Sequence, residues 1–284
     1  MAISVAIQKI WHKAYEHELQ NITSLRNHCD FKYEKDMANA DTVYILGAVK
    51  PTVRTYVPGT DISRDAVDAT RQALVLDQFK YFNIEMDDVY KAQTVPGALE
   101  ATAKEGAIAL SEEGDKYVAS LVKAGVEAGE NPLMSVAKFT PSKSNAIDGI
   151  EEGFQKLYEK NNKVSDTYWL EVAPSYYRFI RPSMTELLTN NIELAKKGVV
   201  GMYGNARITI ENLLPTGKSS GSLADDDTVY NILRTEHAIA FAEQIKETVA
   251  YKPEDAFSEA IKSLYTFGAK IVRPDEIVVI KTTK

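Results

Sequence analysis

Two runs of apolar residues in the first third of the chain have the pattern of β-strands. The first covers 42–46 and continues through 52–57, and it is rich in the β-branched and aromatic residues that suit a half-buried strand. The return run covers 74–86, and at its end Phe82, Ile84 and Met86 share one face. A two-stranded ribbon is marginally stable alone in water. We therefore expect these strands to lie on another surface, such as a neighbouring subunit.

The segment that joins the two runs is mostly polar and charged, so it is not a core element. We expect it to form the end of the ribbon and to contact an adjacent copy of the chain. The residues predicted to make these contacts are Tyr56, Asp61, Arg64, Asp65, Asp68 and Arg71.

A long amphipathic helix is predicted over 98–128, after the Pro-Gly pair at 96–97. Its apolar or small residues follow the three-and-four spacing of one helix face, at Leu99, Ala103, Ala107, Leu110, Tyr117, Leu121 and Val122. At 1.5 Å per residue such a helix is roughly 45 Å long. Three glycines within it each cost about 1 kcal/mol relative to alanine, so packing must hold the helix along its length.

The remaining sequence predicts mixed helix and strand without βαβ regularity. Helical spacing occurs over 147–157 and, with an interruption at Pro182, over 176–188. Strands are predicted over 167–172, 207–210 and 277–280. The period is ambiguous over 238–249 and 257–267, where both helix and strand remain open.

Composition narrows the classes of function. The chain has 284 residues, 33 basic and 40 acidic, and a net charge of -7, so it lacks the electrostatic surface of a protein that binds phosphate backbones. Its one cysteine, Cys29, cannot form an internal disulfide, which fits a reducing compartment. Neither a signal peptide nor an apolar run long enough to span a membrane is expected.

One peptide, 217–221, has the sequence Gly-Lys-Ser-Ser-Gly and matches two catalytic motifs in part. A phosphate-binding loop needs a glycine where the chain has Asn212. The nucleophile elbow of a hydrolase would use Ser219, with Asp225 and His237 following in the right order. That geometry needs a strand directly before the serine, whereas Pro-Thr precedes the match. A Gly/Ser-rich loop is the better interpretation.

Metal binding is weakly indicated by histidine spacing. His12 and His17 would lie about 140° apart around a helix, and His28 and Cys29 would point apart in either regular structure. We expect surface histidines, no metal site and no cofactor.

Several segments in order resemble the major capsid proteins of tailed bacteriophages, which have the Hong Kong 97-type fold. The resemblance rests on 33–36 before the first strand, on 41–59 with 76–82, and on the segment 86–93 leading into the long helix. It continues in the glycine turn, strand and Asn-Leu-Leu-Pro of 199–215 and in 265–280. The order and spacing of these segments carry the resemblance.

The resemblance implies an α+β fold with named parts. These are an N-terminal arm over 1–40, an extended β-hairpin loop over 41–85, a peripheral domain with a spine helix over 86–138, an axial domain over 139–247 and closing strands of the peripheral domain over 248–284. It implies a structural protein of the virion, not an enzyme, that assembles into hexamers and pentamers of an icosahedral shell in the host cytoplasm.

The resemblance also implies partners. We expect a portal, a separate scaffolding protein and an enclosed double-stranded DNA that is not bound by sequence. No lysine lies between Lys50 and Lys80, so we expect no covalent cross-link from the extended loop. Two alternatives stay open: a bacterial nanocompartment shell of the same fold, and a serine hydrolase using Ser219 and His237.

Overall fold

The computed structural model describes residues 25–37, 41–47, 53–55, 58–59, 61, 70–87, 98–127, 134–142, 145–160, 162, 167–183, 199–217, 228–254 and 257–283. Its helices are α2 (Glu34–Met37), α4 (Ala98–Glu127), α5 (Asp148–Glu159) and α6 (Pro174–Ser183), with short 3-10 turns η1 (Arg26–His28), η2 (Glu236–Ala238) and η3 (Pro274–Glu276). The first strands are β1 (Thr42–Gly47), β2 (Thr70–Val75), β3 (Gln78–Asp87), β4 (Ser135–Phe139), β5 (Tyr168–Val172) and β6 (Val199–Tyr203). The later strands are β7 (Ala206–Ile210), β8 (Thr216–Gly217), β9 (Thr228–Thr235), β10 (Ile239–Tyr251), β11 (Ser258–Ile271) and β12 (Ile277–Thr283).

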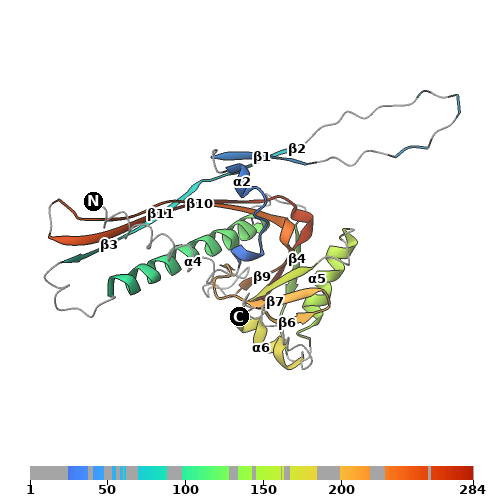
Figure 1. Ribbon diagram of the computed structural model, residues 1–284. Coiled ribbons are helices and arrows are strands. Elements are labelled where there is room, and N and C mark those ends of the chain that lie inside the picture. Colours follow the sequence, from blue (N-terminus) through green and yellow to red (C-terminus); the bar gives the residue numbers. More distant parts are fainter. Residues whose placement is uncertain are drawn as a thin grey trace.

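The strands form three sheets. The antiparallel pair β1–β2 makes a ribbon, and β10, β11 and β3 make a long three-stranded sheet. A seven-stranded sheet has the order β4-β12-β9-β5-β7-β6, with β8 paired to β9. In Figure 1 the three-stranded sheet and α4 extend to one side of the seven-stranded sheet, while the ribbon rises from their junction. The fold is α+β, as predicted.

Helix α4 runs beneath the three-stranded sheet and confirms the predicted long helix almost to the residue (Figure 1). Two of its glycines lie against aromatic side chains of the sheet. A Cβ at Gly106 would be 3.2 Å from the ring of Phe82, and one at Gly114 would be 3.6 Å from the hydroxyl of Tyr265. The glycines therefore permit close approach of helix and sheet, and the packing compensates their poor helix propensity.

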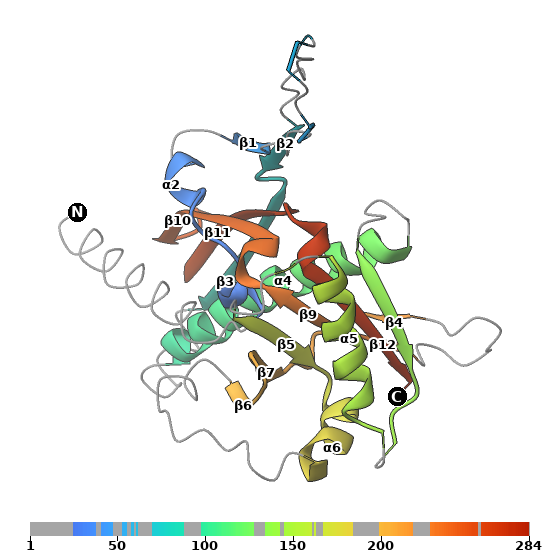
Figure 2. The ribbon, with the colours of Figure 1, turned by 90° about the vertical axis from the view of Figure 1, so that its right-hand side faces the viewer.

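The seven-stranded sheet is covered on both faces. On one face, α5 and α6 pack Ile150, Leu157, Tyr176 and Ile180 against the sheet. The opposite face joins a second core that includes Val118 and other residues of α4. Figure 2 shows α5 lying across β12, β9 and β5. Residues of β5 and β9 are almost all buried, as expected for central strands with both faces covered.

The return run predicted as one ribbon strand is divided between two sheets, which corrects the expected pairing. Only 70–75 pairs with β1, whereas 78–87 pairs with β11. The change occurs at 76–77, where the chain passes over Gly268. A Cβ at Gly268 would lie 2.0 Å from the carbonyl oxygen of Val75, so only glycine permits this crossing.

Both segments of ambiguous period are strands, because β10 and β11 pair with each other over most of their length. This pairing also bears on the expected domain boundaries. The expected limits after 85, 138 and 247 fall inside β3, β4 and β10. The interval 248–284 is shared between two sheets, since β11 lies in the three-stranded sheet and β12 in the seven-stranded one.

Candidate self-association surface

The β1–β2 ribbon has one face covered by its own chain and one face open. Ile45 and Leu74 point inward and pack with Ala240 and Ala242 of β10 and with Met37 of α2. From the sequence, the apolar side of the ribbon was expected to need a foreign surface. For this inner face that expectation is wrong, because β10 and α2 supply the cover.

The outer face of the ribbon leaves large apolar side chains in contact with solvent. Tyr44 is 61% exposed and Leu46 is 65% exposed, and Val75 on the paired strand is 42% exposed. Thr42 pairs with Val75 and Tyr44 with Ala73, so these residues share one face of the ribbon. Several exposed large apolar side chains on one face are a sign of an interaction site.

Two further exposed apolar residues, both aromatic, lie on β3. Phe79 is 62% exposed and Tyr81 is 76% exposed. Phe82, Ile84 and Met86 alternate with the exposed residues and are half-buried, which confirms the predicted alternation at the end of this run. Strand β3 is an edge of the three-stranded sheet, so its outer side is unpaired among the described residues.

We name these five residues the outer apolar face: Tyr44, Leu46, Val75, Phe79 and Tyr81. Because the crossing at Gly268 fixes where the chain leaves the three-stranded sheet, it also sets the position of the ribbon relative to β3. The outer apolar face is thus held on rigid strands, as an interface surface requires.

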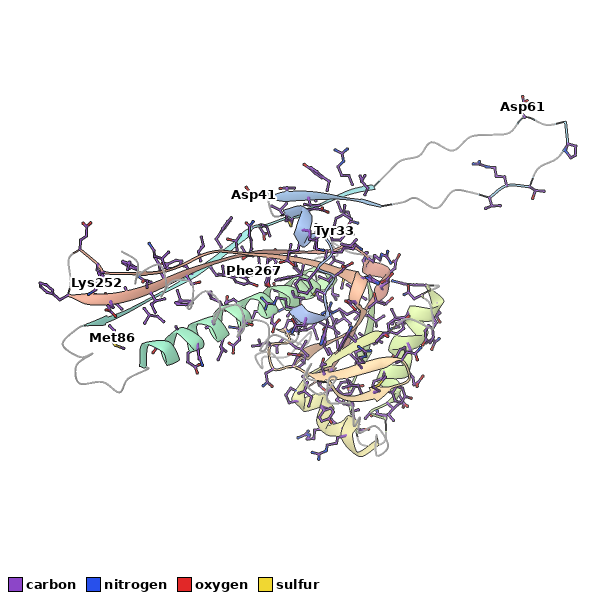
Figure 3. All side chains as sticks on the ribbon, in the orientation of Figure 1. Tyr33, Asp41, Asp61, Met86, Lys252 and Phe267 are labelled. Atoms are coloured by element: carbon purple, nitrogen blue, oxygen red, sulfur yellow. The ribbon has the colours of Figure 1, made fainter. Side chains whose placement is uncertain are left out.

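Two of the six predicted contact residues lie in the described part of the chain. Asp61 is exposed and lies far from the body of the molecule, beyond the ribbon (Figure 3). Arg71 is exposed on β2, opposite Leu46, with its guanidinium carbon 5.3 Å from the centre of the Tyr44 ring. Tyr56, Arg64, Asp65 and Asp68 lie outside the described residues, so their contacts remain a prediction.

Behind this surface, a buried group of charged side chains joins the amino-terminal segment to the seven-stranded sheet. Arg234 donates to both carboxylate oxygens of Glu171, with Nη2 2.7 Å from Oε1 and Nε 3.2 Å from Oε2. Arg234 also donates to the carbonyl oxygens of Leu25 and His28, at 2.8 and 2.9 Å. His28 Nδ1 lies 3.1 Å from Glu171 Oε1, and its ring stacks on Trp169.

The charge states in this group follow from burial and pairing. Burial raises the pKa of Glu171, but Arg234 and His28 outweigh it and hold the pKa below its ordinary value. Burial lowers the pKa of His28 despite the nearby carboxylate. At neutral pH an ionised Glu171 and a charged Arg234 therefore face a neutral His28, whose Nδ1–H donates to the carboxylate.

A second buried group ties the same segment to the three-stranded sheet and α4. The guanidinium of Arg26 is paired with Glu243 of β10 and donates to the hydroxyl of Tyr265 at 2.5 Å. The backbone N–H of Arg26 donates to Asp115 of α4 at 2.9 Å. Residues 25–30 thus lie between the two large sheets and contact both through buried charges.

This junction was not predicted from the sequence. The prediction that His28 is a surface histidine is wrong, because His28 is 1% exposed. Its partners are distant in sequence: Glu171 and Arg234 each occupy a strand with an unremarkable pattern. A charged residue within an otherwise apolar strand, as at Glu171, was the available signal, since unpaired charges are almost never fully buried.

The positions of the described residues give little support to the hydrolase and metal-binding alternatives. Ser219 and Asp225 lie outside the described residues, and His237 is 59% exposed with Nδ1 3.4 Å from Asp30 Oδ2. Within the described ranges, no three His, Cys, Asp or Glu residues are placed to hold a metal ion. His12 and His17 fall outside those ranges. Among the described helices, none is long and apolar enough to cross a membrane.

Comparison with known proteins decides the family. No family model and no curated protein matches the chain. A structure from Mycobacterium phage Che8 is similar with a TM-score of 0.70 and 27% identity, covering 91% of this chain and 90% of that chain. The capsid structure of the cyanophage P-SCSP1u gives 0.66 and 12% identity, covering 93% and 88%. The chain has the Hong Kong 97-type capsid fold, and these matches support a tailed-phage major capsid protein.

Other shells share this capsid fold at lower similarity. A virus-like particle from Pyrococcus furiosus has a TM-score of 0.58 and 12% identity to this chain, covering 96% of this chain and 99% of that chain. The nanocompartment alternative has less support than the phage capsid. The recognised family is one of structural shell proteins, and the resemblance noted in the sequence is confirmed.

Proposed function

We propose that copies of this capsid protein form the hexamers and pentamers of an icosahedral shell, and that each copy covers part of the outer apolar face of a neighbour. The observation that carries the proposal is the exposure of Tyr44 and Leu46 on a ribbon that projects from the body (Figures 1 and 3). Burying one such side chain is worth about 1.5–3 kcal/mol. Repeated in every copy, this gain favours a closed assembly.

The net negative charge of the chain is compatible with a shell that encloses double-stranded DNA. A net charge of -7 disfavours tight binding to phosphate backbones, so double-stranded DNA can be enclosed without adhering to the wall. We propose a structural protein of the virion that has no catalytic role and assembles in the bacterial cytoplasm. Its further partners are a separate scaffolding protein and a portal.

The parts of the capsid protein have proposed roles. The ribbon and the segment through Asp61 act as the extended loop, and Tyr56, Arg64, Asp65, Asp68 and Arg71 contact the adjacent copy. Helix α4 and the three-stranded sheet act as the peripheral domain. The seven-stranded sheet with α5 and α6 acts as the axial domain, and 1–40 acts as the arm.

Electron microscopy of the purified protein, with scaffolding protein where needed, tests the proposal. Wild type is expected to form closed shells. The variant Tyr44→Ser/Leu46→Ser is expected to fold with nearly unchanged stability, because exposed substitutions usually alter it by less than about 0.5 kcal/mol, but not to form shells. The matched control Tyr44→Phe/Leu46→Met keeps the apolar face and is expected to assemble.

Two results would contradict the proposal. Wild type that stays monomeric under all assembly conditions would remove the shell function, and normal shells from the serine variant would remove the role of the ribbon. The ultraviolet absorbance of native particles distinguishes a phage shell from a nanocompartment, because a nanocompartment would contain protein without DNA. A measured esterase activity that is abolished by Ser219→Ala would revive the hydrolase.

A further inference from the structure

The exposed side of α5 is acidic and aromatic. Asp148, Glu151, Glu152, Gln155, Tyr158 and Glu159 follow the three-and-four spacing of one helix face and line an open groove of about 730 Å³. The opposite side of the helix packs Ile150 and Leu157 into the core of the seven-stranded sheet. Among the described residues, no carboxylate of this face lies in a hydrophobic core.

Within the described part of the chain, most carboxylates of this face form no ion pair. Glu152 pairs with Lys156 at 2.7 Å. Glu151 accepts a hydrogen bond from Tyr203, and Glu159 accepts one from Gln155 at 2.8 Å. Across the described residues, neither Glu151 nor Glu159 forms an ion pair. Glu159 lies in the last turn of α5, where the helix dipole disfavours a negative charge, so its position does not serve helix stability.

The exposed side of α6 has the opposite charge. Arg178 and Arg181 are three residues apart, both exposed, and neither forms an ion pair with any described carboxylate. The guanidinium carbon of Arg178 lies 4.6 Å from the centre of the Phe179 ring. Helix α6 packs Tyr176 and Ile180 into the same core as α5, so the two charged surfaces belong to one rigid unit.

We propose that the acidic face of α5 binds the arginine face of α6 on an adjacent copy of the chain. Guanidinium groups suit this surface because they pair with carboxylates through two hydrogen bonds and stack on aromatic rings such as Tyr158. Contacts between two different patches of identical subunits are heterologous, and they close into rings when the rotation permits. Each copy then uses one patch toward each neighbour.

Such a contact also addresses the repulsion between copies. Every copy has a net charge of -7, so copies repel one another unless opposite charges meet locally. Complementary charges give specificity and orientation to an interface more than raw affinity. The inference rests on the proposed shell function and adds the surface through which axial domains meet around a capsomer.

Charge reversal tests this contact. The variants Glu151→Lys/Glu159→Lys and Arg178→Glu/Arg181→Glu are each expected to lower the assembled fraction at least about tenfold, because like charges then face each other at every contact. The variant with all four changes restores opposite charges and is expected to recover assembly. Unfolding midpoints close to wild type show that each variant folds.

A mixture of the two double variants gives a sharper result. Copies with two basic faces and copies with two acidic faces satisfy every contact only when they alternate around the ring. The mixture is therefore expected to form hexamers, which have an even number of subunits, but not pentamers, and closed shells should be rare.

The outcomes separate the inference from the proposed function. If wild type forms no shells, the shell function fails. If wild type and both double variants form shells equally well, only the α5–α6 contact fails. Loss of assembly in the double variants without recovery in the fourfold variant also overturns it, since α5 then meets a different basic partner such as a scaffolding protein.

Discussion

The seven-stranded sheet and the β1–β2 ribbon differ in how their apolar residues are covered. In the sheet, Leu233 and Ile280 pack against α5, while Ile232 and Val279 pack in the second core with α4. The ribbon covers Ile45 with its own chain but leaves Tyr44 and Leu46 open. The apolar residues of the sheet are covered within one subunit, whereas the ribbon leaves an exposed apolar face that we propose a partner covers.

The same comparison applies to charge. Charges at the junction of the two large sheets are buried and form ion pairs, as between Arg234 and Glu171. On the exposed sides of α5 and α6, Glu151, Glu159, Arg178 and Arg181 form no ion pair within the described residues, although Glu152 pairs with Lys156. The buried ion pairs hold the two large sheets together as a rigid body. The exposed charges without ion pairs leave a surface that another copy can bind.

Breaking the buried pair should have the largest effect on the subunit. Arg234→Met leaves the carboxylate of Glu171 buried without its main partner, so we expect a loss of about 3–5 kcal/mol in the free energy of unfolding. Urea denaturation of dissociated subunits measures it. Glu171→Leu/Arg234→Met removes both charges and should cost less than the single change.

The matched control for that change is Arg273→Met. Arg273 pairs with Glu276 at 2.9 Å but is 54% exposed, so its removal should cost no more than about 1 kcal/mol. Equal costs for Arg234→Met and Arg273→Met would show that the junction is not the stabilising contact inferred from its geometry.

Changing the crossing point should have the next largest effect. Gly268→Ala puts a methyl group 2.0 Å from the carbonyl oxygen of Val75, so the backbone must move, at an expected cost of about 1–3 kcal/mol. It should also displace the ribbon and reduce shell formation. Gly106→Ala is the control, because its Cβ would meet only the Phe82 ring at 3.2 Å. A fully stable variant that assembles normally would contradict the role of Gly268.

The buried thiol gives a smaller effect that depends on pH. Burial raises the pKa of Cys29 from its ordinary 9.0 to about 11. Between these values the folded chain keeps a proton that the unfolded chain has lost. The contribution of the protonated thiol to the free energy of unfolding is therefore fully present below pH 9 and falls as pH rises toward 11. Between pH 9 and pH 11, the free energy of unfolding of Cys29→Ala should therefore fall by about 2 kcal/mol less than that of wild type.

Denaturation midpoints of wild type and Cys29→Ala at several pH values check that expectation. The difference between the two proteins should be constant up to about pH 8, because the thiol is protonated in both the folded and the unfolded state there. Parallel curves through pH 11 would mean that the thiol is accessible or is ionised in the folded state.

Elements with a long regular period were predictable from sequence. The spacing over 98–128 and 147–157 gave α4 and α5 because many residues repeat the same period. The long pair β10–β11 was ambiguous because most of β11 is buried on both faces, so polar residues do not mark alternate positions. The division of the return run could not be predicted, because it depends on one close crossing at Gly268 between distant segments.

The candidate surface was predictable only in outline. Alternation indicated a ribbon that needs cover, but it did not show that Ile45 is covered by β10 while Tyr44 is open. That distinction depends on which side of the ribbon faces the body. The junction around Arg26 and Arg234 could not be read from the sequence because its contacts join distant segments, and those of Arg26 with Tyr265 and of Arg234 with His28 span more than 200 positions.

Cysteine labelling of Leu46→Cys tests most directly whether the open face of the ribbon is covered by another copy. Cys29 is 1% exposed, so the new thiol is the reactive one, and wild type gives the baseline. We expect fast labelling in dissociated subunits and labelling at least about tenfold slower in assembled particles, because a neighbour excludes the reagent. Equal rates in both states would contradict the account.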